Sequence, residues 1–111
     1  MERFVAGDII VVPFPFTDLS DIRKRPALVL SNLEGDDIVI CEITSRIRKD
    51  DYVVSLENKD LDSGSLKTKS IIRPNRLLTI NKNKVSYKFG KIKQEKLEEV
   101  LVKLKAVFRC R

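Results

Sequence analysis

The chain has 111 residues, of which 42% are hydrophobic and 34% charged, which is enough for one hydrophobic core and too little for two. This composition argues against disorder over the whole length, and the apolar runs fall far short of the roughly 20 residues that cross a bilayer. Two distant cysteines without a signal-peptide pattern argue against a disulfide scaffold. We expect a single cytoplasmic domain over residues 1–111, with no membrane partner.

The net charge of +6 is unevenly distributed along the chain. Residues 1–60 carry 8 Lys and Arg against 12 Asp and Glu, a charge of −4, whereas residues 61–111 carry 14 against 4, a charge of +10. A basic half suits a phosphate-bearing or acidic partner, because neutralising phosphates releases counterions. A basic surface without a specific partner fits the charge about equally well.

The first half of the chain predicts a series of β-strands. Residues 8–12 are a β-branched run closed by Pro13, which indicates a strand that ends where a backbone donor is lost. A proline-containing and then polar stretch, 14–25, predicts a long loop. A second strand is predicted over 26–31, with its proline first, and a third over 38–43 after a glycine-containing turn.

The middle of the chain has weaker signals. A short fourth strand is predicted at 52–54, and the polar segment 58–68 reads as a loop. Two further short strands, 70–73 and 76–80, are separated by Pro74-Asn75, where a proline interrupts the pattern.

The last part of the chain predicts a turn, a strand and a helix. The turn covers 81–84, and alternating apolar residues over 85–89 resume the sheet. Residues 93–108 follow helical spacing, with acidic residues early and basic residues late, as the helix dipole favours. Short strands followed by one amphipathic helix indicate a mainly β fold of the α+β class, a small partly open barrel or strongly bent sheet.

The chain contains no histidine, which removes the commonest general base and the commonest transition-metal ligand. Acidic pairs such as Asp36-Asp37 and Asp50-Asp51 stand at turn positions, where carboxylates are usually solvated. We assign no metal and no cofactor.

Two segments carry candidate chemistry. Pro26 forces Arg25 into an extended conformation where the predicted loop meets a buried strand, and a guanidinium fork suits a phosphate. An ordinary surface arginine is the competing interpretation. Thr44 and Ser45, followed by Arg46, close the third strand, although such hydroxyls equally often bond the local backbone.

Taken together, several blocks resemble the sequence landmarks of MazF/PemK-like toxins. The resemblance extends over nearly the whole chain, through the blocks Gly7 to Ile10, Val12 to Asp18, Lys24 to Ser31, Ile43 to Ser45, Gly64 to Lys67, Ser70 to Ile80 and Phe89 to Ile92. It implies an SH3-like β-barrel with a C-terminal helix, a homodimer, and metal-independent cleavage of single-stranded mRNA at specific sequences. A cognate antitoxin protein would neutralise the activity.

The resemblance also implies the site residues. Arg25 and Thr44 would form the catalytic pair with Ser45 as a helper, and the ribose 2′-hydroxyl would attack the adjacent phosphate. Phe14 and Phe16 stand beside the basic loop and can stack on an unpaired base, although at least one is expected in the core. The predicted RNA-binding residues are Arg23, Lys24, Phe16, Arg46, Lys69, Arg73 and Arg76.

Two other functions compete with the nuclease. One is a non-catalytic toxin of the same fold that poisons DNA gyrase, and the other is a plain RNA-binding barrel. The combination of Arg25-Pro26 with Thr44 favours the nuclease, since a gyrase poison acts through its C-terminal residues and this chain ends Phe108-Arg109-Cys110-Arg111.

Overall fold

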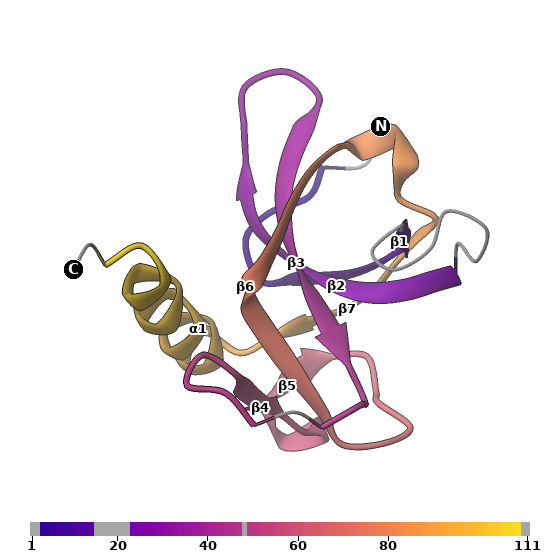
Figure 1. Cartoon of the computed structure of the whole chain (residues 1–111). Helices are drawn as coiled ribbons and strands as arrows, with labels where there is room; N and C mark the ends of the chain where they lie inside the picture. Colours follow the sequence, from indigo (N-terminus) through magenta and orange to yellow (C-terminus); the bar gives the residue numbers. More distant parts are fainter. Residues whose placement is uncertain (1–2, 15–22, 48, 110–111) are drawn as a thin grey trace.

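Seven antiparallel strands form one curled sheet, against which an α-helix packs (Figure 1). The computed structural model describes residues 3–14, 23–47 and 49–109. The elements in chain order are β1 (Asp8–Phe14), β2 (Arg23–Asn32), β3 (Asp37–Thr44), β4 (Val54–Leu56), the 3-10 helix η1 (Asn58–Asp60), β5 (Leu61–Ser63), β6 (Ser70–Asn81), the 3-10 helix η2 (Lys82–Lys84), β7 (Tyr87–Ile92) and α1 (Gln94–Val107). The strand order is β4-β6-β3-β2-β1-β7-β5. The mainly β fold with a C-terminal helix is therefore as predicted.

Strands β1 and β2 are longer than the sequence indicated. Strand β1 continues through Pro13, which pairs with Lys24 of β2. The sheet tolerates this proline because the pairing of β1 with β7 already ends at Val11, so the missing N–H removes no hydrogen bond to β7. Strand β2 begins at Arg23, so Pro26 lies inside it and the prediction that it starts the strand is wrong. Pairing of β2 with β3 begins only at Ala27, which leaves the proline beyond that ladder.

Strand β3 matches its prediction within one residue at each end, and β6 corrects a prediction in part. The predicted strands 70–73 and 76–80 are one strand. The pairing with β3 nevertheless shifts at Pro74-Asn75. Glu42 pairs with Arg73, but the preceding residue, Cys41, pairs with Leu77. Residues 74–76 therefore form a bulge, which is where a sheet tolerates a proline.

The predicted loop 58–68 contains the short elements that connect the two outer strands of the sheet. Strand β4 lies two residues later than predicted, and η1 and β5 occupy part of the expected loop 58–68. The backbone N–H of Glu57 donates to the Asp60 carboxylate at 2.9 Å, and the N–H of Asp60 donates to the Glu57 carbonyl at 2.9 Å. This tight link joins β4 to β5, the two outermost strands in the sheet order.

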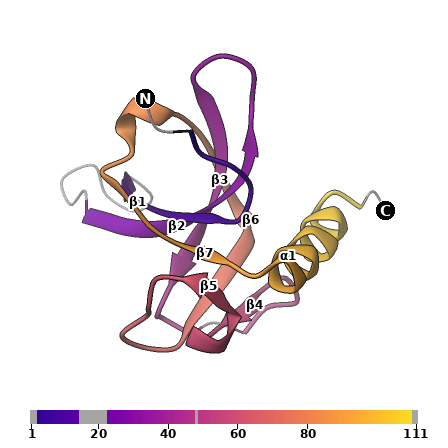
Figure 2. The same ribbon diagram turned by 180° about the vertical axis from the view of Figure 1, so that it is seen from behind.

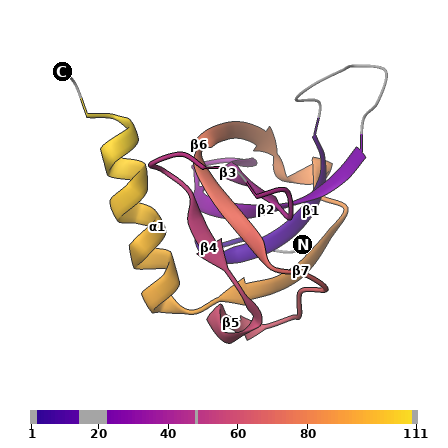
Figure 3. The same ribbon diagram turned by 60° about the horizontal axis from the view of Figure 1, so that its bottom comes forward.

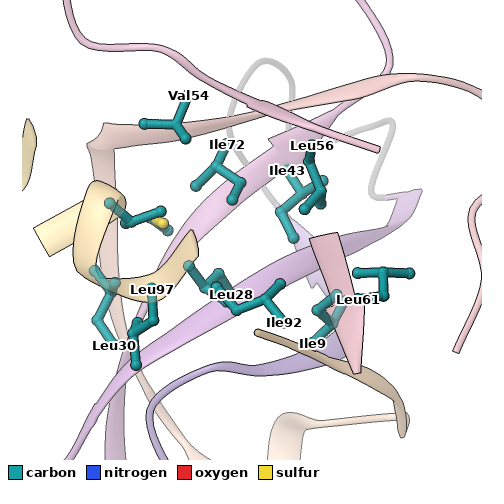
Figure 4. Packing of buried hydrophobic residues seen from close by; sticks show 12 residues of the cluster. Ile9, Leu28, Leu30, Ile43, Val54, Leu56, Leu61, Ile72, Ile92 and Leu97 are labelled. Atoms are coloured by element: carbon teal, nitrogen blue, oxygen red, sulfur yellow. The ribbon is translucent and has the colours of Figure 1, made fainter. Parts of the chain in front are cut away.

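The core lies inside the curl of the sheet. Its larger cluster takes side chains from every strand and from α1, as Figure 4 shows for Val54 and Leu56 of β4, Leu61 of β5 and Ile92 of β7. Both outer strands thus bury side chains in one cluster, and the view from behind shows them close together (Figure 2). The sheet is a partly open barrel, and burial of apolar area in its interior is the main force that holds it.

Helix α1 covers one side of this barrel along β6 and β4 (Figure 3). Leu97 and Val100 are buried against the core, with Leu104 packed beside them, as the predicted amphipathic pattern requires. Phe108, which fits the same spacing, is 68% exposed. Glu95 in the first turn and Lys105 in the last complement the helix dipole. No helix in the described part of the chain is both long and apolar enough to span a membrane.

Cys41 of β3 is a buried free cysteine within the larger cluster. Burial, and after it the neighbouring Glu42 carboxylate, raise the pKa of this thiol far above its ordinary value. It therefore behaves as a small apolar side chain.

Two glycines allow the segment after β5 to lie directly on β7. A Cβ at Gly64 would be 2.6 Å from the Phe89 carbonyl oxygen, and one at Gly90 would be 2.4 Å from the Ser63 carbonyl oxygen. Gly64 also has a φ of +85°, a conformation that other residues rarely adopt. At Gly90 the requirement is contact alone.

We predict that Gly90→Ala lowers the free energy of unfolding by about 1–3 kcal/mol, because the new methyl group must push two backbone segments apart. Thermal and urea unfolding followed by circular dichroism measure the change. Thr79→Ala, at an exposed position of β6, is the control and should change stability by less than about 0.5 kcal/mol. Equal stability of the two variants would show that the close approach is unimportant.

Candidate active site

A pocket of about 520 Å³ opens between the ends of β2 and β3, the segment after β5, and β7. Its lining includes the three predicted catalytic residues, Arg25, Thr44 and Ser45, and the predicted RNA-binding residue Lys24. Its full lining is Lys24, Arg25, Pro26, Ile43, Thr44, Ser45, Ser65, Leu66, Lys67, Thr68, Ser70 and Phe89. Four of the predicted site residues thus meet in one pocket.

The register of β2 and β3 explains why Arg25 and Thr44 meet. Ala27 pairs with Glu42, so Arg25 and Thr44 each lie two residues beyond this pair, at the same end of the two neighbouring strands. Successive side chains alternate between the faces of a sheet, so both belong to the same face as Ala27. Arg25 is half-buried and Thr44 buried, which restricts the rotamers of both side chains.

The hydroxyl of Thr44 has a local partner. Its Oγ1 accepts the backbone N–H of Arg46 at 3.1 Å, a short-range bond that shapes the turn after β3. The competing interpretation of this threonine, as a hydroxyl that bonds the local backbone, is therefore observed. A hydroxyl that accepts still has its proton to donate, so the bond orients Thr44 without removing its use toward a ligand.

The opposite wall is the segment 64–69, which a clamp holds in place. Leu66 donates its N–H to Asn58 Oδ1 at 2.7 Å, and Asn58 Nδ2 donates to the Leu66 carbonyl at 3.2 Å. Together with the contact of Gly64 on β7, this fixes the backbone on both sides of Ser65. Thr68 receives a hydrogen bond on its carbonyl from the Ser70 hydroxyl at 3.3 Å.

All charged side chains among the described lining residues are positive. Lys24, Arg25 and Lys67 are cations, and no carboxylate is among the described lining residues. Hydroxyl groups supply most of the remaining polar atoms. Such a pocket suits an anionic ligand, since cations and neutral donors stabilise a phosphate without a competing negative charge.

Arg73 does not line this pocket. Its guanidinium lies 3.5 Å from a Glu42 carboxylate oxygen and 3.7 Å from one of Asp50, and only 10% of its side chain is exposed. Asp50 in turn accepts the backbone N–H groups of Tyr52 and Val53 at 2.8 and 3.1 Å. The ion pairs therefore attach the segment after Thr44 to β6, and the predicted contact of Arg73 with RNA has no support in this arrangement.

The other predicted RNA-binding residues are scattered. Lys69 lines a neighbouring pocket with Lys67, and its Nζ lies 3.7 Å from Oε1 of Glu57. Arg46 is exposed beyond Ser45, and Arg76 is half-buried in the bulge of β6. Arg23 begins β2, with its backbone opposite Phe14, while Phe16 lies outside the described residues.

Sequence reasoning missed the wall opposite Arg25. The block Gly64 to Lys67 is a landmark of the family resemblance that carries no assigned role, and the polar character of 58–68 gives no indication that its backbone is tightly held. Phe89 looked like one member of an alternating strand. The sequence gives no local signal that β5 and β7 meet, because the two strands that pair there are far apart in the chain.

Acidic side chains do not gather into a metal site in the described part of the chain. No group of three or more His, Cys, Asp or Glu residues there is arranged to hold a metal ion. Asp50 is instead engaged with Arg73, and Asp36 with Lys82 at 3.2 Å.

Comparison with known proteins identifies relatives of this architecture. Residues 6–108 match the model of the family described as PemK-like, MazF-like toxin of type II toxin-antitoxin system. No curated protein sequence matches the chain.

Solved structures share the fold at low sequence identity. An endoribonuclease in complex with its cognate antitoxin from Mycobacterial species has a TM-score of 0.77 at 13% identity, covering 98% of this chain and 100% of that one. MazE-MazF (Form-II) from Deinococcus radiodurans has 0.74 at 19%, covering 100% of both chains. The Mycobacterium tuberculosis toxin MazF-mt6 has 0.73 at 14%, covering 91% and 95%. These likenesses establish the fold.

The buried pair of Arg73 and Glu42 generates a prediction about stability. Arg73→Ala should lower the free energy of unfolding by roughly 3–5 kcal/mol, because Glu42 would remain buried without a cation. Asp50→Asn should cost less than about 1 kcal/mol, since Asp50 is more exposed and the amide retains an oxygen acceptor. Urea unfolding measures both, and a cost for Arg73→Ala no larger than for Asp50→Asn would contradict the structural role of Arg73.

Proposed function

Because the chain belongs to the PemK-like, MazF-like toxin family of type II toxin-antitoxin systems, we propose that it is an endoribonuclease that cleaves single-stranded mRNA at specific sequences. The observation that carries this proposal is the pocket in which Arg25 and Thr44 meet among cations without a carboxylate. The endoribonucleases from Mycobacterial species that share this fold support it.

The proposed reaction is an intramolecular phosphoryl transfer on RNA. The ribose 2′-oxygen attacks the adjacent phosphorus and loses its proton, and the bond from phosphorus to the 5′-oxygen breaks. The leaving 5′-oxygen gains a proton, so the products end in a 2′,3′-cyclic phosphate and a 5′-hydroxyl. Negative charge grows on the phosphoryl oxygens in the transition state, which is where the protein must act.

Arg25 stabilises that charge in this proposal. Guanidinium groups remain protonated in proteins, so Arg25 acts as a fixed cation with two parallel donors and is assigned no proton transfer. Thr44, oriented by its bond from the Arg46 N–H, donates its hydroxyl proton to a phosphoryl oxygen. Ser45 adds a second hydroxyl at the pocket rim. No metal ion or cofactor takes part.

The wider RNA contacts are electrostatic. Lys24 and Lys67 in the pocket and Lys69 beside it lie where they can contact neighbouring phosphates, which gives affinity without sequence selection. The proposed setting is the cytoplasm, where mRNA is present. Neutralisation comes from a cognate antitoxin whose acidic segment binds the basic surface, and complexes with antitoxin among the structural relatives support this partner.

Arg25 and Thr44 give the central prediction. Arg25→Ala should slow cleavage on the order of 10²- to 10³-fold, the usual cost of losing a donor to a developing oxyanion. Arg25→Lys should fall between it and the wild type, because charge is kept and the planar fork lost. Thr44→Ala should cost on the order of 10-fold. Single-turnover cleavage of labelled single-stranded RNA in EDTA measures all four proteins.

The controls separate chemistry from folding and from binding. Circular dichroism should show native folds for the three variants, and RNA binding should change little because other cations supply most of it. Cleavage at the wild-type rate by folded Arg25→Ala would exclude this site. Loss of wild-type activity in EDTA would exclude the metal-independent mechanism.

We also propose that the protein is a homodimer, because two barrels side by side would give RNA a longer basic surface than one short chain offers. Light scattering at micromolar concentration should give twice the 12.8 kDa mass of the chain. A monomer mass over the whole concentration range would contradict this.

A further inference from the structure

Asp8, the first residue of β1, has a buried carboxylate that the proposed reaction does not use. Its side chain is 0% exposed. Its Oδ2 accepts the backbone N–H of Val5 at 2.9 Å, whereas Oδ1 accepts no hydrogen bond from the described residues. The Lys88 ammonium of β7 lies 3.2 Å from Oδ1. Because a buried charge is costly without an opposite charge beside it, Lys88 is the group that compensates this carboxylate.

The ion pair spans an irregularity in the sheet. Ile9 of β1 pairs with Gly90 of β7, but the next residue, Ile10, pairs with Lys88. Phe89 is therefore the extra residue of a β-bulge, a feature that redirects side chains and is frequent beside active sites. The carboxylate comes from β1 on one side of this step and the ammonium from β7 on the other, so the pair holds the two sides of the bulge together.

The residue in the bulge reaches the candidate active site. The side chain of Phe89 lines the pocket of Arg25 and packs against the larger core cluster. Its carbonyl oxygen would be 2.6 Å from a Cβ at Gly64, so the backbone of the bulge also determines where the segment 64–69 can lie. Successive residues of a strand point to opposite faces, and a slip of β7 by one residue would turn Phe89 away from its present face. The position of the bulge therefore determines the wall opposite Arg25.

We propose that Asp8 and Lys88 are positioning residues of the candidate active site. Their ion pair fixes the bulge in β7 and, through Phe89, the distance between this wall and Arg25. Neither residue is among the described lining residues of the pocket, so both act without touching RNA there. The inference rests on the proposed function and goes beyond it, because it makes the geometry of the cleavage site depend on a buried charge pair outside the pocket.

The decisive variant removes both charges. Asp8→Asn/Lys88→Met leaves no buried charge unpaired, so it should fold and melt close to the wild-type temperature. At saturating RNA its single-turnover cleavage should nevertheless be roughly 10-fold slower, because a small misplacement of groups around the reacting atoms is costly. Its affinity for RNA should stay within about 2-fold of wild type, since cations elsewhere supply the binding. A purely structural role would leave the cleavage rate of this folded protein unchanged.

Two further variants separate charge from packing. Lys88→Arg keeps the ion pair and should cleave within about 3-fold of wild type. Asp8→Asn alone keeps an acceptor for the Val5 N–H and leaves a lysine whose side chain is 37% exposed and can be solvated. If the double variant does not fold, Asp8→Asn decides the matter by the same measurements.

Asp36→Asn/Lys82→Met is the matched control. Asp36 and Lys82 form another aspartate–lysine pair with the same 3.2 Å separation, and neither is among the described lining residues of the Arg25 pocket. This control should cleave RNA at the wild-type rate.

A second measurement reports on the wall without RNA. In ¹⁵N–¹H correlation spectra, the amide signals of Ser65 and Leu66 should move in the Asp8→Asn/Lys88→Met variant, because the bulge that supports their segment shifts. The same signals should keep their wild-type positions in the Asp36→Asn/Lys82→Met control.

The outcomes separate the two proposals. If the wild type cleaves RNA and the folded double variant matches it in rate and in the wall signals, the positioning role is overturned and the proposed function stands. An equal loss of rate in the control would also overturn the positioning role. If the wild type cleaves no RNA, the proposed function is overturned, and the amide signals alone decide whether the ion pair fixes the wall.

Discussion

The short link between β4 and β5 is the constraint on which the rest of the structure depends. These strands are the two outer members of the sheet order, and the chain between them is residues 57–60 alone. A flat sheet of seven strands cannot satisfy this connection, because neighbouring strands lie about 4.8 Å apart. The sheet must curl until its outer strands approach each other, and the apolar side chains of every strand then meet in one cluster.

Closure of the sheet also creates the pocket. Arg25 and Thr44 come from the middle of the sheet order, whereas Ser65 and Phe89 come from the segment after β5 and from β7. The glycines at 64 and 90 let these last two segments touch. Asn58, which is part of the link, forms two hydrogen bonds with Leu66 and holds the segment from its other side. The link thus determines both the hydrophobic interior and the distance between the two walls of the candidate site.

This dependence explains what the sequence could and could not predict. The strand over 37–44 and the helix over 94–107 have strong local periodicity, so they were predicted to within one or two residues. The expectation that Arg25 and Thr44 belong to one site followed from the Arg-Pro and Thr-Ser blocks and their resemblance to a family, and both residues line one pocket. Strand β5 has three residues and weak local signal, and the role of Phe89 requires contacts between segments far apart in the chain. Neither feature is encoded in a local pattern. The prediction that Pro26 starts its strand was wrong because the residue lies beyond the ladder with β3, where its missing N–H breaks no hydrogen bond to β3.

Arg25 and Arg73 show the same limit in electrostatic terms. Both stand next to a proline, and through the pairing of Ala27 and Arg73 with Glu42 both belong to one face of the sheet. Arg73 lies beside two carboxylates, so most of its charge is balanced by the protein itself and its energetic effect is on the fold. The described lining around Arg25 has cations and hydroxyls but no carboxylate. The positive charge of Arg25 is therefore not balanced within the pocket and can stabilise an anion that binds there. Two arginines with similar sequence surroundings therefore differ in role because of the groups that the sheet places beside them.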